Sequence, residues 1–386
     1  MSARARRFDR PDYWILAVVG IMCIIGVLMV FSSSGINEED RNLITKHIFA
    51  LGVGMAAMFV TMSVPYERLR RLSVPLLVFS AVLLMLVLVI AEPVNGAKRW
   101  LDFGPLSFQP SELVKFALVL YLADWCYSKG DQVRDLSNGL VPFGIVLGFL
   151  GGLVFIEPDM GTMLVIFAIG TTMYFVSGAA ILHLIGGFVL AIVGFLLAAI
   201  AEPYRFARIL SFLDPYNPAQ ELGSNYHILQ SLMTLGSGGL TGQGLGASRG
   251  KYGWLFAQST DAIFSVWAQE VGFVGALLLI GLFIVFAWRG FRVARLAPDG
   301  FTALLATGLT TWVIAQAMIN IGAVSGAIPF TGVPLPFISY GGSSLVITLS
   351  GVGLLLNLSR YATSERAVPA GVGAGLRVLR TVEGRR

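Results

Sequence analysis

The chain has 386 residues, of which 56% are hydrophobic and only 13% are charged, and its mean hydropathy is +0.77. These values exclude an ordinary water-soluble domain of this length. The two cysteines and three scattered histidines exclude a disulfide scaffold and a structural zinc site. The net charge of +5 is explained by membrane topology, so no nucleic-acid partner is predicted.

Long apolar runs predict an all-α polytopic membrane protein of about ten transmembrane helices. The run from Tyr13 to Phe31 reaches the ~20 residues that cross a bilayer core. It follows four arginines, as a signal peptide would, but its length and the lack of a cleavage pattern at residues 32–34 favour a signal anchor. Strand-like alternation is absent, so helices satisfy the backbone in lipid. The predicted spans are 13–31, 46–64, 72–91, 112–127, 139–156, 162–177, 181–201, 262–288, 301–325 and 343–359.

The basic residues predict the orientation of these spans. With the N-terminus inside, the cytoplasmic segments hold 18 Lys and Arg residues and the opposite side holds eight, while Lys115 lies within a span. Because basic loops resist translocation, both termini are expected in the cytoplasm. Residues 1–12 and 361–386 are then cytoplasmic tails of a single transmembrane domain, residues 13–360.

Three outer segments, 92–111, 202–261 and 326–342, are too long and too patterned to be simple connections. The outer loop 202–261 contains NYHILQSLMTLGSGGL, which we expect on or in the outer membrane interface. The segment 326–342 contains most of IPFTGVPLPFISYGGSS, with three prolines and three glycines. Such backbone is tolerated at membrane depth only inside protein or beside a wet cavity, so we predict a re-entrant segment that closes a site.

Lys115 is the most costly residue inside a predicted span. A lysine in a membrane helix costs roughly 2.5–3.5 kcal/mol on insertion scales, so it needs a partner. Glu112, three residues earlier on the same helical face, can supply one. The pair could simply position the helix. We favour the alternative that Lys115 is a cation lining a cavity for an anionic substrate.

Acidic residues mark two further places. Glu157 and Asp159 flank a proline at the outer end of the fifth span, where either could be a solvated helix cap or a functional carboxylate. Asp261 opens the eighth span beside Thr260, so it is either a cap or a shielded general base. Glu270 lies about 900° further around that helix and faces away from Asp261, so the two are not an acid/base pair.

Four blocks of the sequence resemble the SEDS family of bacterial cell-wall polymerases, whose best-known members are FtsW and RodA. The blocks are NGAKRWLDFGPLSFQPSELVKFALVLYLA, EPDMGT, YRFARILSFLDPYNPAQELGSNYHILQSLMTLGSGGLTGQGLG and IPFTGVPLPFISYGGSSLV. They are spread from residue 95 to 346, and YRFARILSFLDP slightly favours the FtsW branch. Around Asp261 the chain reads LFAQSTDAIFSVWAQE, where the family has wording close to LPEAHTDFIFAI, although the Thr-Asp pair is kept.

The resemblance implies a peptidoglycan glycosyltransferase of the bacterial cytoplasmic membrane. Such an enzyme joins lipid II units to a lipid-linked nascent glycan at the outer leaflet, with a class B penicillin-binding protein as partner and other division or elongation proteins nearby. Asp261 matches the family's presumed catalytic aspartate. Candidate substrate-binding residues, from the family's cavity and the blocks around it, are Arg99, Glu112, Lys115, Asp159, Arg208, Thr260, Ser339 and Tyr340.

On this hypothesis, the acceptor's 4-hydroxyl attacks the anomeric carbon and displaces polyprenyl pyrophosphate with inversion. Asp261 takes the hydroxyl proton, while the cations hold the pyrophosphate and Glu112 and Asp159 orient them. No cofactor is certain, but a divalent cation, Mg or Mn, could bridge the aspartate and the pyrophosphate.

Two other classes of function fit the same features. A lipid II flippase would use the same charged cavity, although the long outer loop and the outward-placed acid favour polymerisation. A purely structural scaffold for division proteins would leave Lys115 without a purpose.

Overall fold

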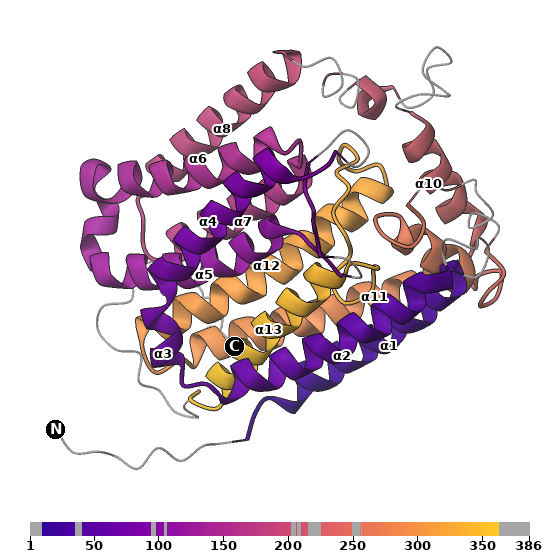
Figure 1. The fold of residues 1–386 in the computed structure, drawn as a ribbon, viewed down its shortest axis with the longest axis horizontal. Coiled ribbons are helices and arrows are strands. Elements are labelled where there is room, and N and C mark those ends of the chain that lie inside the picture. The colour runs from indigo at the N-terminus through magenta and orange to yellow at the C-terminus, as the bar shows by residue number, and fades with distance from the viewer. Residues whose placement is uncertain are drawn as a thin grey trace, which may run out of the picture.

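The computed structural model describes residues 10–34, 41–93, 98–103, 106–201, 206, 210–214, 225–248, 255 and 257–362, and these form a bundle of long helices (Figure 1). The longer helices are α1 (Tyr13–Ser34), α2 (Arg41–Ser63), α4 (Ser73–Ile90), α5 (Pro110–Lys129), α6 (Val141–Ile156), α7 (Met160–Val176), α8 (Ile181–Ala201), α11 (Ile263–Arg295), α12 (Gly300–Val324) and α13 (Gly342–Ser359). The shorter elements are α3 (Tyr66–Arg71), α10 (Tyr226–Ser237), a 3₁₀ turn (Gly130–Arg134), a π turn (Leu136–Leu140) and the strands β1 (Leu101–Phe103) and β2 (Leu106–Phe108).

Each of the ten predicted spans coincides with one of the longer helices, which confirms the all-α polytopic fold. Within the described part of the chain, seven helices are long and apolar enough to cross a membrane, and α7 and the described start of α8 are shorter apolar helices. Helix α5 is the tenth, and four charged side chains lower its hydropathy: Glu112, Lys115, Asp124 and Lys129.

Most helices differ from the predicted spans by one to three residues, but two extend well beyond them. Helix α2 begins at Arg41 rather than at residue 46, and α11 continues to Arg295 rather than stopping at residue 288. An apolar run marks only the part of a helix that lipid can cover, whereas the helix itself continues as long as its backbone hydrogen bonds do. Because the residues at these two ends are polar, hydropathy did not mark the true start of α2 or the true end of α11.

A small hairpin interrupts the helical pattern before α5. Strands β1 and β2 pair antiparallel, with Leu101 opposite Phe108. The hairpin is joined to α13 through Ser343, whose Oγ donates to the Ser107 carbonyl at 2.9 Å and accepts from the Gln109 N–H at 3.2 Å. The start of α5 is thereby fixed against the start of α13.

Helices α2 and α13 pack closely because small residues let their backbones approach (Figure 1). A Cβ on Gly353 would collide with the Met58 carbonyl and the Thr61 hydroxyl. Thr61 Oγ1 donates to the Ser350 carbonyl at 2.8 Å. At the end of α2, the amide of Asn357 donates to the Met62 carbonyl at 2.6 Å and to the Val64 carbonyl at 2.9 Å. Polar bonds thus reinforce a contact that apolar packing alone would leave unspecific.

The start of α1 is joined to the ends of α11 and α13 by Asp12. Its carboxylate pairs with Arg289, whose Nε lies 2.9 Å from Asp12 Oδ2. Its backbone N–H donates to Ser359 Oγ at 3.0 Å. This end of the bundle is opposite the end where α11 begins, which carries Asp261.

Between α12 and α13, residues 326–341 form a non-helical segment, here named the closing segment. Thr331, Val333 and residues 335–339 are buried, and Gly332 and Phe337 have positive φ values of 72° and 68°. The prediction of a re-entrant, irregular backbone enclosed by protein is therefore confirmed.

Candidate active site

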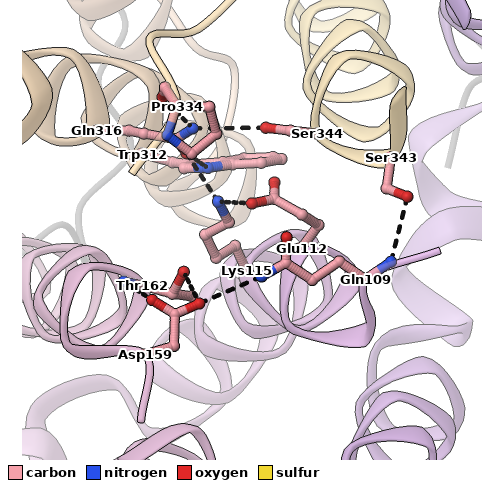
Figure 2. A network of polar contacts seen from close by, with 10 residues as sticks. All are labelled: Gln109, Glu112, Lys115, Asp159, Thr162, Trp312, Gln316, Pro334, Ser343 and Ser344. Carbon is pink, nitrogen blue, oxygen red and sulfur yellow. Dashed lines mark hydrogen bonds and ion pairs between the residues drawn. The ribbon is translucent and has the colours of Figure 1, made fainter. Parts of the chain in front are cut away.

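Lys115 lies at the centre of a buried polar network on α5 (Figure 2). Its Nζ is 2.7 Å from Glu112 Oε1 and 2.8 Å from Gln316 Oε1, and it lies 5.6 Å from the centre of the Trp312 ring. The side chain of Lys115 is fully buried and that of Glu112 is 1% exposed. Low dielectric strengthens such a pair, but it makes the removal of either partner expensive.

Gln316 connects this pair to the closing segment. Its Oε1 accepts from both Lys115 and the Trp312 indole, the latter at 3.0 Å. Its Nε2 donates to the Pro334 carbonyl at 3.0 Å (Figure 2). A proline cannot donate from its own backbone nitrogen, so this carbonyl is its only strong polar group, and Gln316 satisfies it.

Asp159 is the N-cap of α7. Its carboxylate accepts from the Thr162 N–H at 3.0 Å, from Thr162 Oγ1 at 2.9 Å and from Gln109 Nε2 at 3.2 Å (Figure 2). The next turn contacts the closing segment, because a Cβ on Gly161 would collide with Val333. Asp159 therefore has the geometry of a cap, but a buried cap rather than the solvated one that the sequence suggested, and it lies beside the same segment as Gln316.

Asp261 lies just before α11, where the closing segment contacts it. The Asn320 amide donates to the Asp261 carbonyl at 2.7 Å and to the Val333 carbonyl at 2.7 Å. A Cβ on Gly332 would lie 3.3 Å from Asp261 Oδ2, so the absence of a side chain at that position leaves room for the carboxylate. The Asp261 side chain remains partly exposed, unlike that of Lys115.

The neighbouring candidates fasten the closing segment to the chain before Asp261. Ser339 Oγ donates to the Thr260 carbonyl, and the Tyr340 N–H donates to the Ser259 carbonyl at 2.8 Å. Thr260 Oγ1 in turn donates to the Ala257 carbonyl at 3.3 Å. These contacts are structural, and the predicted roles of Thr260, Ser339 and Tyr340 in substrate binding stay predictions.

One face of α12 joins the two halves of the site. Gln316 and Asn320 are one helical turn apart. Gln316 binds Lys115 and the carbonyl of Pro334. Asn320 binds the carbonyl of Asp261 and that of Val333, the residue before Pro334. Lys115 and Asp261 are therefore parts of one connected region, although a common open cavity stays a prediction.

Arg99 and Glu157 lie at the connection between α6 and α7. The Arg99 guanidinium donates to the Glu157 carbonyl at 3.0 Å and to the Pro158 carbonyl, so it caps the end of α6. The Glu157 carboxyl is fully buried, and among the described residues neither of its oxygens has a hydrogen-bond partner. Burial, and to a lesser extent nearby Asp159, raises the pKa of Glu157 to about 9 against the opposing effect of Arg99, so the group is neutral at pH 7.

The sequence reasoning named the charged residues but missed the amides that connect them. Gln316 and Asn320 lie in TTWVIAQAMINIG, and polar side chains one turn apart inside an apolar span were the available signal. Gln109 carried no such signal, because its partner Asp159 comes from a distant part of the chain. Arg208, another predicted candidate, lies outside the described residues.

The fold and the site define a multi-pass membrane protein with a polar site enclosed by its helices. The chain belongs to the family of FtsW, RodA and SpoVE cell cycle proteins, whose family model matches residues 13–364. Stage V sporulation protein E of Bacillus subtilis is 40% identical over 362 residues, covering 91% of this chain and 98% of that protein. A probable peptidoglycan glycosyltransferase FtsW of Trichlorobacter lovleyi is 38% identical over 361 residues, covering 92% of this chain and 94% of that protein.

Solved structures agree with this assignment. A chain from a study of structural coordination of polymerization and crosslinking by a peptidoglycan synthase complex has a TM-score of 0.77 and 32% identity, covering 92% of this chain and 99% of that chain. The rod shape determining protein RodA of Thermus thermophilus has a TM-score of 0.69 and 30% identity, covering 92% of this chain and 98% of that chain. The predictions of a SEDS protein and of an enzyme of the peptidoglycan glycosyltransferase class are confirmed.

Proposed function

We propose that this chain polymerises lipid II into glycan strands at the outer leaflet of the bacterial cytoplasmic membrane, for cell division or elongation. The site then faces outward and both termini lie in the cytoplasm, as the distribution of basic residues favours. The observation that carries the proposal is the connection of Asp261 and Lys115, through Asn320 and Gln316, to residues 333 and 334 of the closing segment.

Asp261 is the proposed general base. Its side chain is partly exposed, so an acceptor hydroxyl can reach it, and the Asn320 bond to its backbone holds it in place. The carboxylate takes the proton of the 4-hydroxyl as that oxygen attacks the anomeric carbon of the donor. Such proton transfer contributes typically 10²–10⁴-fold to the rate.

Lys115 is the proposed partner for the leaving pyrophosphate. In this structure its ammonium is fully buried and bonded to Glu112 and Gln316, so direct contact with the pyrophosphate requires Gln316 to release it. Arg99 is partly exposed and is the proposed first contact, with Arg208 as a further cation of the same group. Glu112 holds Lys115 in position through their ion pair. Asp159 holds Gln109 and Thr162 through the hydrogen bonds that it accepts from them.

A divalent cation is a proposed helper. Among the described residues, no three His, Cys, Asp or Glu side chains form a group that could hold a metal. A single partly exposed carboxylate, Asp261, instead fits the mode in which Mg²⁺ takes one carboxylate together with substrate phosphates and water. Bound there, the ion would offset the charge of the pyrophosphate.

The proposed partner is a class B penicillin-binding protein, and the similarity to a chain from a peptidoglycan synthase complex supports it. Polymerisation by the full-length chain with that partner tests the function directly. Asp261→Asn should abolish glycan formation from lipid II, and undiminished polymerisation would remove the base assignment. A parallel assay of headgroup accessibility separates polymerase from flippase, because a flippase moves the lipid without forming glycan.

A further inference from the structure

Helix α11, whose N-cap Ala262 follows Asp261, is broken about two turns later at Gly272. This glycine has φ 75° and ψ −172°, a conformation outside the helical region. A break in a membrane helix frees backbone N–H and C=O groups that lipid cannot satisfy. The partners of these groups therefore decide how the first part of α11, residues 263–271, is held.

The glycine-rich segment after α10 supplies these partners. In residues 238–244, here named the glycine clamp, the N–H groups of Gln243 and Gly244 donate at 3.0 Å to the carbonyls of residues 269 and 270. In return, the N–H of Phe273 donates to the Gly239 carbonyl at 2.9 Å, and that of Val274 donates to the Leu240 carbonyl at 3.2 Å. The clamp thus makes the hydrogen bonds that an unbroken α11 would make with itself.

The contact requires glycine on both sides. A Cβ on Gly242 would overlap the Glu270 carbonyl, and one on Gly272 would overlap the Gly242 nitrogen. A Cβ on Gly238, which has an ordinary helical φ of −71°, would overlap the Ala268 carbonyl. Backbone therefore packs directly against backbone at these three glycines. Because the colliding atoms are backbone atoms, a shift of a side chain could not relieve the collision that an added Cβ would cause.

Side chains strengthen the same contact. Gln269 Nε2 donates to Ser237 Oγ at 2.6 Å, and Gln269 Oε1 accepts from Ser248. From α1, Ser32 Oγ donates to Glu270 Oε1 at 2.7 Å. Residues 263–271 are thus bonded to α10, to the clamp and to α1, while Asn320 of α12 holds Asp261 just before them.

We infer that the glycine clamp is a positioning element for Asp261, with Gly238, Gly242 and Gly272 as positioning residues. The clamp bonds residues 269 and 270 before the break and Phe273 and Val274 after it, so it fixes the first two turns of α11 relative to both α10 and the remainder of the helix. Loosening of the clamp therefore moves the carboxylate relative to the closing segment. The inference rests on the proposed function, because it assigns the clamp to the placement of the proposed base.

The test compares glycine-to-alanine variants of the full-length protein with its transpeptidase partner. Gly238→Ala adds only the backbone collision, whereas Gly246→Ala adds only strain, since Gly246 has φ 79° with nothing within 4 Å of its Cβ position. Gly281→Ala, further along α11, adds neither. Gly238→Ala should lower kcat at least tenfold with KM changed less than twofold, because small displacements of a catalytic group are costly. Gly246→Ala and Gly281→Ala should keep kcat within about twofold.

A milder variant and a second measurement cover the case in which Gly238→Ala fails to fold. Ser237→Ala removes one bond to Gln269 and should lower kcat about threefold, consistent with the loss of one partly buried hydrogen bond. Hydrogen exchange of amides 263–271 should accelerate in both variants but not in Gly281→Ala. If exchange accelerates and kcat is unchanged, the positioning role is wrong. If the wild type forms no glycan, the proposed function fails, while the exchange measurement still decides whether the clamp holds α11.

Discussion

Lys115 Nζ lies 2.7 Å from Glu112 Oε1, with both side chains almost completely removed from solvent. The ion pair is buried among α5, α12 and the closing segment, where Gln316 supplies the second bond to the ammonium. The two charges therefore neutralise each other beside the closing segment, whose Pro334 carbonyl is bonded to Gln316.

Removing the lysine should destabilise the protein strongly. Lys115→Met leaves the Glu112 carboxylate buried and unpaired, so we expect a loss of about 3–5 kcal/mol in the free energy of unfolding. The double variant Lys115→Met, Glu112→Leu should recover most of this loss. Chemical denaturation in detergent measures both, with Lys129→Met at the end of the same helix as the control. An equal loss in single and double variants would contradict the argument.

Asn320→Leu should weaken both stability and catalysis. It leaves the carbonyls of Asp261 and Val333 without their amide donor, at a cost of about 2 kcal/mol or more. Because Asn320 holds the backbone of the proposed base, kcat should fall at least tenfold. Asn357→Leu is the matched control, since it removes an amide that binds the carbonyls of Met62 and Val64 away from Asp261. Thermal unfolding together with steady-state polymerisation should show similar stability losses but a kcat loss in Asn320→Leu alone.

The buried carboxyl of Glu157 predicts a pH dependence of stability. Its pKa is raised from 4.5 to about 9 by burial, so the folded state keeps the proton after the unfolded state has lost it. Its contribution to stability is complete below pH 4.5 and is lost progressively as the pH rises to about 9. Glu157→Gln should flatten the decline of the thermal midpoint across this range. The exposed Glu92→Gln should keep the wild-type profile; a decline that is the same in all three proteins would exclude Glu157 as its cause.

The close approach of α2 and α13 predicts a position-specific response to added methyl groups. Gly353→Ala drives a Cβ into the Met58 carbonyl and Thr61, so we expect a loss of about 1–3 kcal/mol. Gly52→Ala, on α2 with nothing within 4 Å, should leave the unfolding free energy unchanged or slightly higher. Denaturant titrations of the two purified variants compare them directly, and equal stability would show that the helices can move apart without penalty.

Much of the fold follows from hydropathy because lipid imposes a simple requirement. An apolar run of sufficient length must be a helix, so all ten spans were predictable, as was the i, i+3 pairing of Glu112 with Lys115. Helix ends were less predictable, since α11 continues to Arg295 beyond its apolar part.

The connections within the site were not predictable, because they depend on partners far apart in sequence. Gln316 and Asn320 were visible as polar residues, but not their bonds to Pro334 and Asp261. The break at Gly272 was also hidden, because a glycine in an apolar run is compatible with a continuous helix. Only the approach of Gly242 to the same point reveals why the helix changes direction there.

The pairing of α2 with α13 has a consequence for biogenesis. A ribosome makes α2 among the first helices and α13 as the last of those described, yet the carbonyls of Met62 and Val64 find the Asn357 amide only on α13. During synthesis, the α2 face around Thr61 must therefore remain in lipid or against an insertion factor until α13 has been made. A chain interrupted before α13 would keep that face, with the carbonyls of Met62 and Val64, without its partner.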